Sequence, residues 1–227
     1  CHSSVGNSRA LELAGIDENT PDPAGGKIEK DENGRPTGFM REVSASQLLI
    51  RAKSALSYEN DIKNLVNSSE HYLENGIVAI GEMMGRLHPY ASLKLYQDAY
   101  KAGFMPKSAI YYVADEVDGP LEIAQTDRLR VAGLKVFMDG SISGETAYMK
   151  AGFPSGKKGV CLTSQARLKE IIDYARDNHL QVAVHAMGDK AVQNVIDVCQ
   201  NLDPWLDGMP SVRIEHASLT VSYTHLT

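Results

Sequence analysis

The sequence has few cysteines, no long hydrophobic stretch and no basic run, and each absence excludes a class of protein. Three cysteines, an odd count without CxxC spacing, argue against a disulfide framework and indicate a reducing compartment, so we expect a cytoplasmic protein. No stretch approaches the roughly 18 consecutive apolar residues of a transmembrane helix, so we expect no membrane partner. A net charge of −6 with scattered Lys and Arg argues against nucleic acid.

Glycine-rich phosphate-binding motifs are also absent. No GxGxxG or GxxxxGK[ST] follows any of the apolar runs, which removes the main support for a nucleotide-binding protein. What is present is a chain of 227 residues, 43% of them hydrophobic, enough to form a sizeable core.

Short apolar runs alternate with amphipathic segments from about residue 60. This alternation predicts parallel strands buried on both faces, in a doubly wound sheet or a (β/α)8 barrel. Polar residues at the ends of the strands favour the barrel. Five strands cannot close one, so we expect an α/β partial TIM-type barrel and a chain that is a fragment. The predicted strands are 77–80, 108–113, 134–138, 181–185 and 212–216, and the predicted helices are 62–73, 92–102, 121–132, 168–175 and 192–199.

The N-terminal part follows a different pattern. A short helix is predicted over 8–14 with Gly15 as its C-cap. Residues 20–38 are rich in turn formers, and Asn33-Gly34 predicts a β-hairpin or a long loop. We therefore expect residues 1–60 to be a loop and hairpin insertion within the barrel domain, 61–220 to be the partial barrel, and 221–227 to be a tail of uncertain origin.

Two of the predicted strands end in a histidine, His185 and His216, with one helix between them. In a parallel barrel such strand ends converge on one rim, where neutral imidazoles can bind a transition metal. Hydrogen-bonded structural histidines are the alternative. Lys135 lies within a third apolar strand, where it needs either an ion-pair partner, Asp139 or Glu145, or a chemical role.

Two aspartates lie next to these strands. Asp139 begins an Asp-Gly-Ser segment that a simple turn would also explain. Asp189 stands where the next helix starts, and we expect it to be the N-cap of that helix.

Six segments in series resemble the amidohydrolase superfamily, in particular the amidohydrolase family 3 branch that includes N-substituted formamide deformylases. They extend over most of the chain in the expected order. The segments are His2–Ser8 with Ala10-Leu11 and Ala14-Gly15, Pro21–Gly26, Gly34–Gly38, Leu134–Ser141, Val184–Asp189 and Arg213–Ala217.

The resemblance implies a (β/α)8 barrel, of which this chain covers roughly strands two to six, with a metal site at the rim. His185 and His216 would be the metal ligands of strands five and six. Lys135 matches the strand-four lysine that is carboxylated in related members and bridges two metals. The cofactor would be one or two divalent ions, with Zn²⁺ expected first and Mn²⁺, Fe²⁺ or Co²⁺ as alternatives.

The resemblance also assigns residues to the substrate side, namely His2, Asn7 and Asp139. The first metal ligands of the family would precede Cys1, and the general-base aspartate would follow Thr227. We therefore expect the chain alone to be inactive.

The expected function is metal-dependent hydrolysis of a carbon–nitrogen bond, a non-peptide amide or formamide, in a small molecule. The alternatives are a deaminase or esterase of the same superfamily, and a non-catalytic truncated barrel module. The expected partner is the small-molecule substrate, and homo-oligomerisation is left open.

Overall fold

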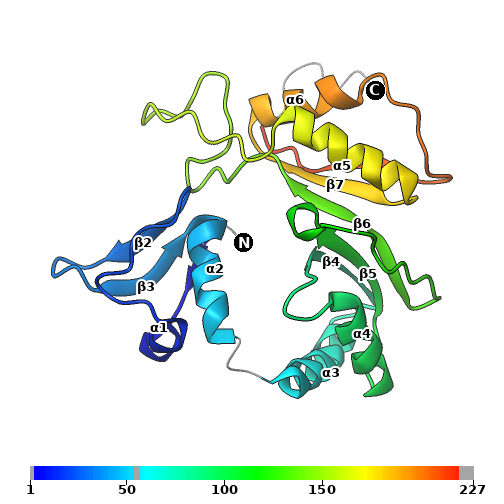
Figure 1. The fold of residues 1–227 in the computed structure, drawn as a ribbon, viewed down its shortest axis with the longest axis horizontal. Helices are drawn as coiled ribbons and strands as arrows, with labels where there is room; N and C mark the ends of the chain where they lie inside the picture. Colours follow the sequence, from blue (N-terminus) through cyan, green and yellow to red (C-terminus); the bar gives the residue numbers. More distant parts are fainter. Residues whose placement is uncertain (1–2, 54–56, 220–227) are drawn as a thin grey trace. The chain divides into compact units, whose positions relative to one another are not determined.

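The computed structural model describes residues 3–53 and 57–219 of the chain (Figure 1). The chain divides into two compact units, Cys1–Tyr58 and Glu59–Thr227. His2 and the tail 221–227 lie outside the described residues.

The first unit is a three-stranded antiparallel sheet with helix α2 packed on it and helix α1 packed against α2. The strand order is β1-β3-β2, and a small apolar core lies between sheet and helices. The elements are β1 (Ser3–Val5), α1 (Ser8–Ala14), β2 (Lys27–Lys30), β3 (Pro36–Arg41) and α2 (Glu42–Lys53), and the buried core residues are Ala14, Ile16, Ile28, Met40 and Ala45.

Two predictions for this unit are confirmed. Helix α1 occupies 8–14, with the Asn7 side chain accepting from the Ala10 amide at 2.9 Å and Gly15 ending the helix at φ 66°. The predicted hairpin is formed by β2 and β3. The Asp31 carboxylate stabilises its turn by accepting from the amide of Arg35 at 2.8 Å. Helix α2 was not predicted, because its sequence mixes serines with the apolar residues and lacks a regular helical stripe.

The second unit is a five-stranded, wholly parallel sheet of order β4-β5-β6-β7-β8. Neighbours in the sheet are also neighbours along the chain, as in a barrel wall, and the sheet does not close on itself, so the predicted partial barrel is confirmed. The elements are α3 (Tyr58–Glu74), β4 (Ala79–Gly85), α4 (Ser92–Lys101), β5 (Lys107–Val113), a 3-10 turn η1 (Ala114–Glu116), β6 (Leu129–Phe137), α5 (Gln165–Asp177), β7 (Gln181–Ala186), α6 (Asp189–Cys199) and β8 (Val212–His216).

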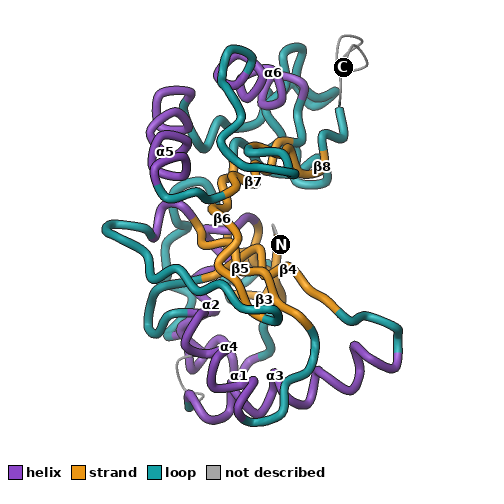
Figure 2. The backbone as a smooth tube through the Cα atoms, turned by 90° about the vertical axis from the view of Figure 1, so that its right-hand side faces the viewer, coloured by secondary structure: helices purple, strands orange, loops and turns teal. Residues whose placement is uncertain are grey.

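Helices cover one face of this sheet. α5 packs on β6 and β7, and α6 packs on β7 and β8, as the two views in Figures 1 and 2 show. The apolar sides of α4, α5 and α6 and the outward side chains of the strands together form the main core. Within the described residues, no helix is both long and apolar enough to cross a membrane.

The prediction of a helix over 121–132 is wrong. The structure has an irregular segment there, followed by β6, which begins at Leu129. Thr126 explains the difference, because its hydroxyl accepts from the Leu129 amide at 2.9 Å and its own amide donates to the Leu129 carbonyl at 2.9 Å. This tight turn reverses the chain, and the buried Leu129 and Val131 alternate with exposed or half-buried neighbours, as in a strand.

The strand predicted over 77–80 is displaced. β4 begins at Ala79 and runs through Gly81 to Gly85. Gly81 was expected to end the strand, but its backbone is paired with Ala109 of β5 in the parallel ladder, and this tertiary pairing outweighs the poor strand propensity of glycine.

Gly133, in the central strand β6, is enclosed by the two neighbouring strands, so that a side chain at this position has no room. It pairs with Tyr111 on β5 and Gln181 on β7. A Cβ atom at this position would lie 2.1 Å from the Gln181 carbonyl oxygen and 2.8 Å from the Tyr111 ring. The Tyr111 hydroxyl also donates to the Gln181 side-chain carbonyl at 2.7 Å, so neither neighbour can move without losing this bond.

We therefore expect Gly133→Ala to lower the free energy of unfolding by about 1–3 kcal/mol or more, as overpacked cores do. Urea unfolding followed by circular dichroism measures this. Gly119→Ala is the matched control, because a Cβ there meets nothing within 4 Å, and its stability should stay within about 0.5 kcal/mol of the parent. Equal unfolding midpoints for the two variants would contradict the close approach.

Candidate active site

The side chains of Phe137, His185 and Glu215 lie next to one another on one face of the sheet, because their parallel strands pair these residues in register. Phe137 pairs with His185 on β7, and His185 pairs with Glu215 on β8. Alternate residues of a strand face the same side, so Lys135 shares this face with Phe137. We call it the inner face, since the opposite side chains of β6 and β7 belong to the core under the helices.

His216 reaches the same region by a change in backbone direction. It pairs with Ala186, whose side chain belongs to the core under the helices, so a regular strand would direct His216 away from the inner face. Instead His216 has φ 74° and Ala217 has φ 46°. The ring of His216 lies 4.9 Å from that of His185, edge to face at 73°. Left-handed backbone at two consecutive non-glycine residues is costly and typical of functional sites.

Lys135 is buried on the inner face, with 4% of its surface exposed. Its Nζ lies 5.0 Å from the centroid of the Phe137 ring. Burial lowers the pKa of Lys135 to about 8; the carboxylate of Glu215 opposes this change, and the guanidinium of Arg213 adds to it. At pH 7 about a tenth of Lys135 is therefore the neutral, nucleophilic amine, a far larger share than for a lysine with the ordinary pKa of 10.5.

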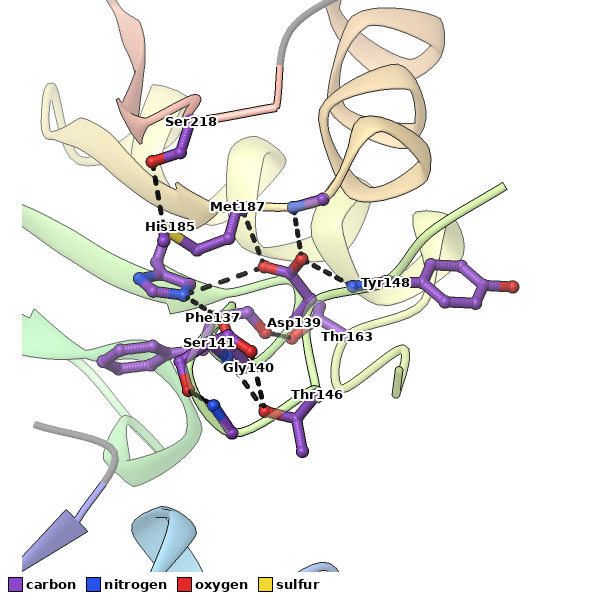
Figure 3. Close-up of polar contacts among 12 residues, drawn as sticks. Phe137, Asp139, Gly140, Ser141, Thr146, Tyr148, Thr163, His185, Met187 and Ser218 are labelled. Atoms are coloured by element: carbon purple, nitrogen blue, oxygen red, sulfur yellow. Dashed lines mark hydrogen bonds and ion pairs between the residues drawn. The ribbon is translucent and has the colours of Figure 1, made fainter. Parts of the chain in front are cut away.

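The two carboxylates considered as ion-pair partners of Lys135 are engaged with other groups. Glu145 pairs with Lys157, at 3.1 Å between Oε2 and Nζ. Asp139 is fully buried and accepts three backbone amides, as Figure 3 shows. Its Oδ1 accepts from Met187 at 2.9 Å, and its Oδ2 accepts from Gly188 and Tyr148, both at 2.8 Å.

His185 is oriented by the backbone that follows Asp139. Its Nε2 lies 2.8 Å from the carbonyl oxygen of Gly140 and 3.7 Å from Oδ1 of Asp139 (Figure 3). A carbonyl oxygen can only accept, so Nε2 carries the proton. In a neutral imidazole Nδ1 is then the acceptor nitrogen, and it is the atom that would ligate a metal.

The structure thus brings together three of the predicted site residues, His185, His216 and Lys135, on or beside the inner face. Imidazole nitrogens are ligands that suit Zn²⁺ and other divalent transition metals. Within 3–53 and 57–219, no group of three or more His, Cys, Asp or Glu could hold a metal ion. A role of His185, His216 and Lys135 as metal ligands therefore stays a prediction.

The three predicted substrate-side residues differ in what the structure describes of them. Asn7 belongs to the first unit, where its side chain caps α1. His2 is outside the described residues, and Asp139 is enclosed by backbone amides. Substrate contacts of these three residues stay predictions.

Asp189 is not the N-cap of α6, because the structure places Gly188 there. Asp189 is the first helical residue, and its Oδ1 accepts from the Lys150 amide at 2.9 Å. The sequence analysis also missed Thr146, whose hydroxyl accepts from the Ser141 amide at 2.9 Å and shapes the loop after β6. A threonine five residues from its partner carries no local signal of this role.

The sequence model of the amidohydrolase family matches residues 1–226. The chain belongs to the amidohydrolase family. This agrees with the six resembling segments and with the partial barrel.

Relatives of this amidohydrolase-family chain are much longer than the chain. It is 32% identical over 211 residues to the exoenzymes regulatory protein AepA of Pectobacterium carotovorum subsp. carotovorum, covering 86% of the chain and 44% of that protein. It is 28% identical over 235 residues to the N-substituted formamide deformylase of Arthrobacter pascens, covering 96% and 42%. The crystal structure of an uncharacterized metal-dependent hydrolase from Pyrococcus furiosus superposes with a TM-score of 0.72 at 26% identity, covering 98% and 45%. The chain therefore spans less than half the length of each.

The burial of Lys135 predicts a specific pH dependence of stability. The folded-state pKa of about 8 lies below the ordinary value of 10.5, so the unfolded state binds more protons between these values. The free energy of unfolding should therefore rise as the pH increases from about 8 to 10.5, and the penalty is fully present below pH 8. At about 1.4 kcal/mol per pKa unit, the penalty is about 3 kcal/mol.

We expect Lys135→Met to be more stable than the parent at pH 7 and to lose this rise with pH. Urea unfolding at pH 7, 9 and 10.5 measures both effects. Lys63→Met, on an exposed position of α3, is the control and should follow the parent. A Lys135→Met variant that keeps the parent's pH dependence would show that the lysine is not desolvated.

Proposed function

We propose that this chain is part of a metal-dependent amidohydrolase that hydrolyses a carbon–nitrogen bond other than a peptide bond, in an amide or formamide of a small molecule. The observation that carries the proposal is the buried amine of Lys135 on the same sheet face as His185, whose ring touches that of His216. The family membership supports a hydrolase. The names of the A. pascens deformylase and the P. furiosus hydrolase support the bond type and the metal.

Divalent ions, with Zn²⁺ expected first, would supply a water of lowered pKa and polarise the carbonyl of the substrate. The residues of this chain hold and neutralise them. His185 offers Nδ1, because its Nε2 proton is committed to the Gly140 carbonyl. His216, the last residue of β8, offers an exposed ring, and its left-handed backbone conformation brings that ring to His185.

Lys135 supplies the anionic group. The ammonium first releases one proton to solvent; the resulting neutral amine attacks carbon dioxide, forming a carbon–nitrogen bond and releasing a second proton. A buried cation would thereby become a carbamate anion. The carbamate oxygens would then help to hold divalent ions and to neutralise their charge. The lowered pKa of Lys135 favours this reaction, because only the unprotonated amine is nucleophilic.

The histidine assignment is tested in the gene product that contains these residues. We expect His185→Ala and His216→Ala to lose bound metal and amide or formamide hydrolysis, whereas His71→Ala, on an exposed position of α3, keeps both. Elemental analysis by mass spectrometry and a hydrolysis screen give the two readouts. Wild-type metal content in either of the first two variants would refute its role as a ligand.

The carbamate is tested separately with ¹³C-labelled bicarbonate. We expect the metal-loaded protein to show one carbamate carbon in its NMR spectrum that Lys135→Met lacks and Lys63→Met retains. Lys135→Met should also bind fewer metal ions per chain. An unmodified Lys135 in metal-loaded protein would contradict the bridging role and leave the histidine assignment standing.

A further inference from the structure

We propose that Asp139 is a positioning residue for His185: its buried carboxylate fixes the loop whose Gly140 carbonyl holds the imidazole proton on Nε2 and leaves Nδ1 as the acceptor nitrogen. The consequence for metal binding rests on the proposed function. The hydrogen bonding that sets the tautomer does not.

The Asp139 carboxylate ties three chain segments together. Its two oxygens accept the amides of Met187 and Gly188, which lie between β7 and α6, and the amide of Tyr148 in the loop after β6. The side chain itself is fully buried. A buried carboxylate that accepts backbone amides makes charge-assisted hydrogen bonds, which are about twice as strong as neutral ones.

Asp139 acts on His185 in two ways. Its backbone continues directly into Gly140, whose carbonyl oxygen lies 2.8 Å from Nε2, so a fixed Asp139 fixes the acceptor. Its Oδ1 also lies 3.7 Å from the same nitrogen, where a negative charge favours a proton. Both effects place the proton on Nε2.

The loop is built so that the Gly140 carbonyl cannot turn away easily. The Gly140 amide donates to the Thr146 carbonyl at 3.3 Å, and the Ser141 amide donates to the Thr146 hydroxyl at 2.9 Å. A Cβ on Gly140 would lie 2.1 Å from that hydroxyl oxygen, so only glycine fits (Figure 3). The peptide that contacts His185 is held on both sides.

The tautomer matters because a metal ligand must offer a lone pair on a defined nitrogen. Partners that hold the other ring nitrogen of a ligating histidine change metal affinity by roughly 10- to 100-fold when they are removed. Asp139 would exert this control through the Gly140 carbonyl and its own charge, and the control needs no contact between Asp139 and a metal. A role in substrate binding alone would instead raise KM and leave the tautomer of the ligand-free protein unchanged.

The test is ¹⁵N NMR of the histidine ring nitrogens in the metal-free gene product, at a pH where the imidazole is neutral, with His185 assigned by its absence in His185→Gln. We expect the Nε2–H tautomer in the parent. In Asp139→Asn, where an amide nitrogen replaces one accepting oxygen, the Nδ1–H population should rise by about 2- to 10-fold, the change expected for one lost hydrogen bond.

Two further variants guard against a simple loss of folding. Thr146→Val removes the hydroxyl that accepts from the Ser141 amide and should also raise the Nδ1–H population. Thr146→Ser keeps a hydroxyl and should show the parent's tautomer. Asp189→Asn is the matched control, because Asp189 contacts the same loop at Lys150 and should leave the tautomer unchanged.

Three outcomes of these measurements would overturn the proposal. The first is an Nδ1–H tautomer in the parent, and the second is a folded Asp139→Asn that keeps the parent's tautomer. The third applies if Asp139→Asn does not fold, and it is the same tautomer in Thr146→Val and Thr146→Ser. Zinc titration adds the second readout, with the dissociation constant of Asp139→Asn expected to be roughly 10- to 100-fold higher. If the parent binds no zinc while the tautomers respond as expected, the proposed function fails and the positioning role stands.

Discussion

The parallel hydrogen-bonded register between β6, β7 and β8 is the constraint on which the candidate site depends. It sets Phe137, His185 and Glu215 side by side, and it places Lys135 one pleat earlier on the same face. Because side chains alternate along a strand, a slip of one residue in either ladder would move His185 into the core under the helices and bring an apolar neighbour to the inner face. The apolar residues between the functional ones therefore specify the site as much as the functional residues do.

Much of the fold follows from local sequence. The continuous apolar strands and the amphipathic helices are strong patterns, and α1, α4, α5, α6 and the parallel order of the sheet follow them. The segment 121–132 did not, because the Thr126 turn and the pairing of β6 with β5 override an amphipathic pattern that would suit a helix. Strand pairing involves residues distant in sequence, and a local pattern does not report it.

The candidate site was predictable where residue type and strand position were enough. His185 and Lys135 stand on predictable strands, and their shared face follows from strand periodicity. The contact of His216 with His185 depends on a left-handed backbone at two non-glycine residues, for which the sequence gives no sign. Asp139 was equally hidden, because a buried carboxylate accepting three amides from two other segments has the same local sequence as a turn.

Glycines close the loop that surrounds Asp139. A Cβ on Gly188 would meet the Tyr148 carbonyl oxygen at 2.2 Å, and one on Gly159, at φ 75°, would meet that of Ala147 at 1.8 Å. This part of the rim is therefore packed as closely as a protein interior, although loops ordinarily tolerate sequence change. Sequence drift is thereby channelled away from it: with the role proposed for Asp139, a side chain at either glycine would disturb the support of His185, so variation has to accumulate in other loops.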